Sequence, residues 1–160
     1  MSGFNFVLRL RPRGAFVLFV VLDLFCMGVG MGVPLFNIAL GFVVGWYIVR
    51  WVSSGTREIW DILKRLLLYA CITSCVTLVG MIVIWGPSVM LLFDGKTDLA
   101  EFGIPQILFE PRASFIGWLV LMMVISPFLQ LMTTIFGGHL ALLSTRKREG
   151  KSEAYTGATA

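Results

Sequence analysis

The chain has 160 residues, of which 58% are hydrophobic and 14% are charged, with a formal net charge of +4. A soluble globular domain is about half apolar and about a quarter charged, so this composition argues against a water-soluble protein. The positive residues flank apolar runs instead of forming one basic face. They therefore indicate contact with a membrane surface and not with nucleic acid.

Four apolar segments are each long enough to cross a bilayer, whose hydrocarbon core of about 30 Å requires ~20 helical residues. We predict spans at about 15–31, 35–52, 66–86 and 115–143. The first two are separated only by Gly32–Pro34, and Pro34 suits the first turn of a new helix, so we expect a tight hairpin there. The predicted fold class is all-α, a four-span transmembrane helix bundle within residues 15–143.

The positive charges predict the orientation of this bundle. Eleven of the thirteen Lys and Arg residues lie in the tail at 1–14, in the stretch 50–65 that ends the second span and connects it to the third, and in the tail at 144–160. The positive-inside rule places these three segments in the cytoplasm. Both termini are then cytoplasmic, as an even number of spans requires, and the pattern is typical of a bacterial inner membrane protein.

The tail regions differ in composition. Residues 1–14 form a basic cytoplasmic tail that resembles the start of a signal peptide, but no small-x-small cleavage site follows and Asp23 interrupts the apolar core. We therefore expect an uncleaved first span. Residues 144–160 end in small and polar residues, which predicts a disordered cytoplasmic tail.

Two connections have distinctive patterns. Residues 54–65 place Ile59, Trp60 and Leu63 on one side of a helix and charged residues on the rest, which predicts a short cytoplasmic interfacial helix. The same pattern also fits a helix that docks on a partner. The outer connection between the third and fourth spans combines apolar runs with acidic residues and prolines. We expect a partly apolar loop that lies on the outer face of the membrane.

Asp23 is the most informative residue, because it lies inside the otherwise apolar first span. A carboxylate in hydrocarbon costs roughly 2.5–3.5 kcal/mol on insertion scales, so it should face protein or water and have a partner. Three interpretations stay open. Asp23 fixes the register of the helices, or it is a proton or cation site, or it contacts another subunit.

Depth along each helix suggests hydrogen-bond donors for this carboxylate. At about 1.5 Å per residue, Asp23 lies about 12 Å into the first span, Ser74 about 12 Å into the third, and Thr134 about 15 Å from the inner end of the fourth. We therefore predict an intramembrane polar site of Asp23, Ser74 and Thr134. The neighbouring hydroxyls of Thr73 and Thr133 are alternative donors.

Small residues recur at helical spacing and predict the faces through which the helices pack. Gly41 and Gly45 form a Gly-x-x-x-Gly pair in the second span, and Gly137 and Gly138 lie in the fourth. Membrane helices associate through such small residues because the surrounding lipid is as apolar as leucine. The fourth span also contains Ser126–Pro127, which should kink it.

The sequence shows no constellation of catalytic or metal-binding residues. No phosphate-binding loop, zinc motif or nucleophile elbow occurs, so we predict no enzyme activity, no cofactor and no metal. The single histidine, His139, faces away from the polar side chains of its helix. Cys71 and Cys75 share a face of the third span and are expected to be free thiols.

These patterns favour a non-enzymatic membrane component. We predict that its partners are the lipid bilayer and a second copy of the chain or another membrane subunit, with no nucleic acid. The alternative is a small oligomeric transporter or channel in which Asp23 is a proton or cation site.

Overall fold

The computed structural model describes residues 12–29, 35–55, 58–94, 99 and 109–157. Within these ranges every element is helical, in the order given by the following bounds: α2 Pro12–Val29, α3 Leu35–Ser53, α4 Ile59–Trp85, the 3-10 helix η1 Gly86–Leu92, α5 Pro111–Val120, the π-helical turn η2 Leu121–Ile125 and α6 Ser126–Gly157. The all-helical class predicted from the sequence is confirmed.

Three helices are long and apolar enough to cross a membrane. They are Leu35–Ser53 with 19 residues, Ile59–Leu92 with 34 and Pro111–Thr145 with 35. The helix α2 is shorter, with 18 residues, and carries Arg13 and Asp23, and it is not among these three. The predicted break between the first two spans agrees with the end of α2 at Val29 and the start of α3 at Leu35. The expected hairpin itself lies outside the described residues.

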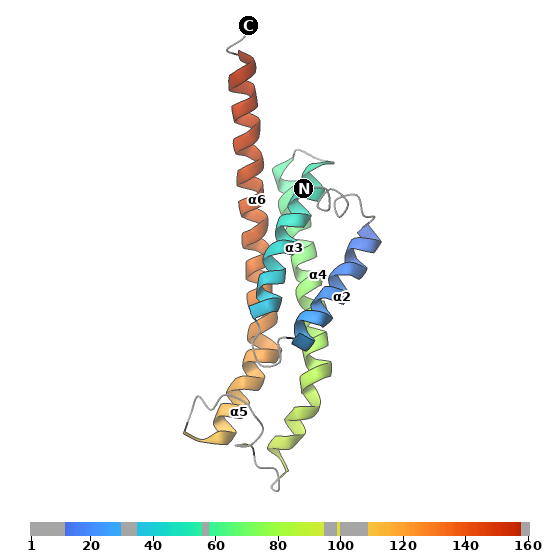
Figure 1. Ribbon diagram of the computed structural model, residues 1–160, viewed down its shortest axis with the longest axis vertical. Helices are drawn as coiled ribbons and strands as arrows, with labels where there is room; N and C mark the ends of the chain where they lie inside the picture. Colours follow the sequence, from blue (N-terminus) through green and yellow to red (C-terminus); the bar gives the residue numbers. More distant parts are fainter. Residues whose placement is uncertain (1–11, 30–34, 56–57, 95–98, 100–108, 158–160) are drawn as a thin grey trace.

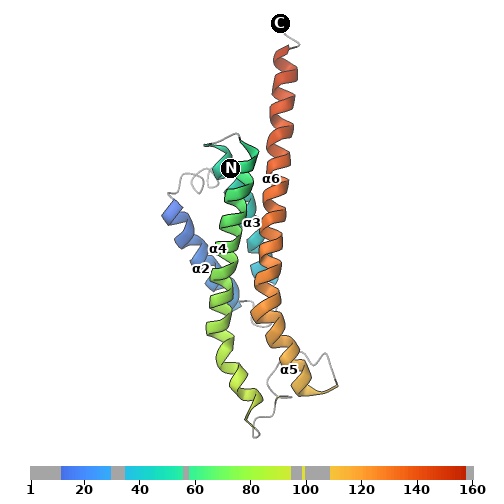
Figure 2. The same cartoon turned by 180° about the vertical axis from the view of Figure 1, so that it is seen from behind.

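The helices alternate in direction along one long axis (Figure 1). The start of α2 and the far end of α6 lie at the same end of the bundle, and α5 lies at the opposite end. The helices α3 and α6 run side by side in the same direction, as the view from behind also shows (Figure 2). The helix α2 crosses the bundle obliquely and diverges from α3 and α4 toward its own N-terminus (Figure 1).

The predicted interfacial helix does not form a separate element. Residues 59–65 are instead the first turns of α4, which continues without a break to Trp85. Neither proline nor glycine interrupts the sequence from Ile59 to Val79. Because helix elongation adds one hydrogen bond for each residue that is ordered, the amphipathic segment and the apolar span join into one helix.

The expected kink at Ser126–Pro127 takes the form of a π-helical turn, η2, directly before it. The Ser126 N–H donates to the Leu121 carbonyl, five residues earlier, in place of the usual four. Pro127 has no N–H, and its ring would clash with the carbonyl of the preceding turn. The wider π turn relieves this conflict within the helix.

The helix α6 continues to Gly157. Arg-Lys-Arg-Glu at 146–149 are residues of good helix propensity, which favours continuation of the preceding helix. In Figure 1 this part of α6 projects beyond the rest of the bundle.

The core has two apolar clusters with a polar layer between them. One cluster contains Met27, Met81, Phe115, Trp118, Leu119 and Met122, and the other contains Ile48, Val49, Val52, Ile62, Leu66 and Ala141. Apolar residues of the predicted outer connection, Val89, Leu91, Leu92 and Leu99, pack against the first cluster. Arg112 Nη2 donates to the Leu92 carbonyl at 2.9 Å, which ties this segment to the start of α5.

Candidate functional site

A layer of buried polar side chains crosses the bundle between the two apolar clusters. Its members come from all four long helices and are each at most 6% exposed: Asp23, Asn37, Thr73, Thr77, Ser126, Gln130 and Thr134. On α4, Thr73 and Thr77 lie between Leu66 and Met81, which belong to opposite clusters. Each helix thus places its polar residues at the same level, between two apolar ends.

Asp23 is at the centre of this layer and is 1% exposed. The hydroxyl of Thr77 on α4 donates to Oδ2 of Asp23 at 2.7 Å, and Nε2 of Gln130 on α6 donates to Oδ1 at 3.4 Å. One carboxylate therefore joins α2 to two other helices.

The donors predicted from depth are not the donors observed. Ser74 Oγ donates to the Pro127 carbonyl at 2.8 Å, and Thr134 Oγ1 donates to the Gln130 carbonyl at 2.7 Å. A hydroxyl has one proton to donate, so these two residues cannot also donate to Asp23. The alternative donors are also engaged: the Thr73 hydroxyl has the Tyr69 and Ala70 carbonyls as acceptors within 3.0 Å, and the Thr133 hydroxyl has the Ile38 and Gln130 carbonyls.

The error has a geometric cause. Depth along each predicted span does not give a common level, because α2 begins at Pro12 and α4 at Ile59, and α2 crosses the bundle obliquely. Thr77 lies almost one turn beyond Ser74 on α4, and Gln130 lies one turn before Thr134 on α6, which is the same displacement toward the opposite end of the bundle.

Three polar atoms in the layer are buried without a hydrogen-bond partner among the described residues. They are Nδ2 of Asn37, Oγ of Ser126 and Oε1 of Gln130. An added Cβ at Gly41 would contact the Gln130 carbonyl, and one at Gly45 would overlap the Thr134 carbonyl. Because α3 and α6 run in the same direction, this register places Asn37 level with Ser126.

The site predicted from the sequence lacks Asn37, Thr77, Ser126 and Gln130. Each is a polar residue on the small-residue face of its span, so the signal for their burial was present. What the sequence does not contain is the alignment of the helices along the membrane normal. A shift of one turn exchanges every donor that faces Asp23.

The glycines expected to pack lie where α3, α4 and α6 approach one another. An added Cβ at Gly45 would overlap the backbone of Thr134, and one at Gly137 would overlap the backbone of Phe42. At Gly138 it would meet the side chain of Leu66 on α4. Only residues without a Cβ allow these helix backbones to come so close.

No protein-family model matches this chain, and no curated protein or solved structure matches it. The chemistry of the polar layer therefore has to be read from its own residues. In the described part of the chain, no three His, Cys, Asp or Glu side chains are grouped as metal ligands. Cys71 and Cys75 are exposed free thiols, and His139 Nδ1 lies 2.9 Å from the Ile135 carbonyl of its own helix.

The layer thus offers one carboxylate, two carboxamides and several hydroxyls. These groups can hold helices together through hydrogen bonds, and their oxygens can also contact a water molecule or a small cation.

Proposed function

We propose that the chain is a four-span, non-enzymatic membrane protein that acts by packing with copies of itself or with another membrane subunit. The observation that carries this proposal is the enclosure of Asp23, whose two carboxylate oxygens accept hydrogen bonds from two other helices. An enclosed carboxylate with two partners fits a residue that fixes helix register. The surface of the bundle is then the part available to partners.

The apolar character of the surface supports the same proposal. Large hydrophobic side chains are exposed along α2, and Val17, Val21 and Phe25 are 57–65% exposed. A helix that presents such residues on its outer side contacts lipid or another apolar helix. The basic segments at one end of the bundle favour cytoplasmic termini, in a membrane such as the bacterial inner membrane.

A specific observation supports transport as a second candidate. Asn37 Nδ2, Ser126 Oγ and Gln130 Oε1 are buried without partners among the described residues, and Gln130 also binds Asp23. Buried polar groups normally find a partner in the protein or in water. A site that holds water or a proton next to Asp23 would provide these three atoms with a hydrogen-bond partner.

Topology is tested by labelling single cysteines in a background where Cys26, Cys71 and Cys75 are replaced by alanine. With four spans, a membrane-impermeant maleimide added to intact cells labels the Asp94→Cys variant. It labels the Ser54→Cys variant only after the membrane is permeabilised. Labelling of both variants from the same side would contradict the predicted topology.

The two functions are separated by comparing wild-type protein with the Asp23→Asn variant. The assembly proposal expects a particle in detergent that is larger than one chain, and no proton or cation flux by wild-type protein in vesicles. Flux in wild-type vesicles that the Asp23→Asn variant loses, with unchanged particle mass, would support transport instead. A strictly monomeric particle without a co-purifying subunit would contradict assembly.

A further inference from the structure

An apolar groove of about 180 Å³ lies between α2, α3 and α4, on the side where α2 diverges from the bundle. It is lined by Phe19 and Leu22 of α2, Val44 and Trp51 of α3, and Tyr69 of α4, among others. Cavities of about 150 Å³ with apolar walls hold a benzene-sized group. The groove is therefore wide enough for a segment of an acyl chain.

A second hollow, of about 210 Å³, adjoins the groove at Trp51. Its lining is mainly apolar and includes one charged side chain, that of Arg65, together with Trp51, Val52, Ser54 and Gly55. The Trp51 ring lies edge-on to Tyr69, with centroids 6.1 Å apart. Trp51 thus lines both the apolar groove and the hollow that contains Arg65, a position typical of tryptophan at a membrane surface.

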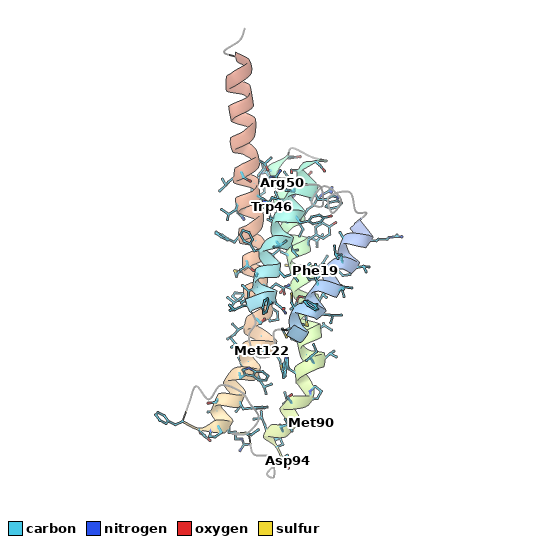
Figure 3. All side chains as sticks on the ribbon, viewed as in Figure 1. Phe19, Trp46, Arg50, Met90, Asp94 and Met122 are labelled. Atoms are coloured by element: carbon cyan, nitrogen blue, oxygen red, sulfur yellow. The ribbon has the colours of Figure 1, made fainter. Side chains whose placement is uncertain are left out.

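Each helix that walls the groove carries an arginine at this end. Arg13 lies in the first turn of α2, Arg50 in the last turn of α3, and Arg65 near the start of α4. The Arg50 guanidinium lies 5.0 Å from the ring centroid of Trp46, another groove residue, and its Nε is buried without a hydrogen-bond partner among the described residues. Figure 3 shows Arg50 and Trp46 close together near the end of α3, with Phe19 nearer the middle of the bundle.

We propose that this groove binds one anionic phospholipid from the adjacent leaflet. One acyl chain lies in the apolar groove beside Phe19 and Tyr69, and the phosphate lies in the second hollow beside Arg65, with Arg50 at the neighbouring end of α3. The charge complementarity selects an acidic head group, because each arginine near a membrane surface attracts anionic lipid. The proposal needs α2 to lie in the membrane and does not depend on the assembly state.

The test measures lipid adducts of the purified full chain by native mass spectrometry, with phosphatidylglycerol and phosphatidylcholine as probes. Wild-type protein should retain one phosphatidylglycerol in preference to phosphatidylcholine. The Arg65→Gln variant should bind phosphatidylglycerol about fivefold more weakly, as expected for loss of one basic residue. The Lys64→Gln variant, with a neighbouring charge outside the hollow, should match wild-type protein.

A second variant tests the acyl-chain part of the site. Ala15 lines the groove on α2, so an Ala15→Phe substitution should fill it and reduce retention of phosphatidylglycerol with all arginines intact. Circular dichroism of each variant confirms that the helices are formed. The proposal would be overturned if wild-type protein retained both lipids equally, or if the Arg65→Gln and Lys64→Gln variants lost phosphatidylglycerol binding equally. Displacement of the lipid by inorganic phosphate would also overturn it.

Discussion

Replacing Gly45 with alanine should destabilise the bundle more than any other single methyl addition tested here. The added Cβ would overlap the Thr134 carbonyl on α6. Backbone atoms cannot rotate away, so α3 and α6 must separate along their contact. Overpacking typically costs about 1–3 kcal/mol, and we expect a loss at the upper end of this range. The measurement is the free energy of unfolding in mixed micelles titrated with a denaturing detergent.

The chain contains matched controls for this experiment. A Cβ at Gly28 or Gly117 has nothing within 4 Å, and alanine has the better helix propensity by about 1 kcal/mol. Both alanine variants should therefore be as stable as wild-type protein or slightly more stable. Gly138→Ala should be intermediate, because its neighbour is the flexible side chain of Leu66. Unfolding of the Gly45→Ala and Gly28→Ala variants at the same fraction of denaturing detergent would contradict the close contact between α3 and α6.

Replacing Asp23 with leucine should lower the free energy of unfolding, whereas replacing it with asparagine should leave this free energy nearly unchanged. Leucine removes the acceptors of the bonds from Thr77 and Gln130. A buried polar group left without its partner costs about 1–3 kcal/mol. Thr77 keeps a carbonyl acceptor, Thr73, at 3.2 Å, so most of the cost falls on Gln130.

Asparagine preserves the shape of the side chain and one acceptor oxygen. Its Oδ1 can accept from Thr77, and its amide can donate to Gln130 Oε1, which has no partner in the described structure, after rotation of the Gln130 amide. The same unfolding measurement applies to both variants, and Phe25→Leu at an exposed position of α2 serves as the control. If Asp23→Asn lowers the free energy of unfolding as much as Asp23→Leu does, the negative charge itself is needed. A fully stable Asp23→Leu variant would contradict a role in fixing helix register.

The burial of Asp23 could be predicted from the sequence, whereas its hydrogen-bond donors could not. A lone carboxylate in an apolar run predicts burial and hydrogen bonding, because ionised groups are costly in hydrocarbon, and Asp23 is buried and bonded. The identity of the donors depends on helix start, tilt and register. The observed donors Thr77 and Gln130 lie about one turn from the predicted donors Ser74 and Thr134, because the sequence does not give the relative register of the helices.

The same distinction applies to the helix ends. The break between α2 and α3 follows from local chemistry, since Gly32–Pro34 disfavours a continuous helix. Residues 59–65 join the following span in one helix, α4, and the amphipathic pattern did not predict this. Such a pattern indicates which side of a helix is polar, but not where the helix ends. The kink before Pro127 was predictable, whereas its form as a π turn was not.

The sequence by itself determined that this protein is built from apolar helices and where most of these helices are separated from one another. It also identified Asp23 as the charged residue within an apolar helix. These properties depend on local composition and on the cost of exposing polar groups to lipid. The tertiary structure alone decided that four helices place their polar side chains in one layer, that α3 and α6 touch through glycine, and that α2 diverges to leave a groove. Those features depend on the relative register and tilt of helices, which arise from contacts between segments far apart in the chain.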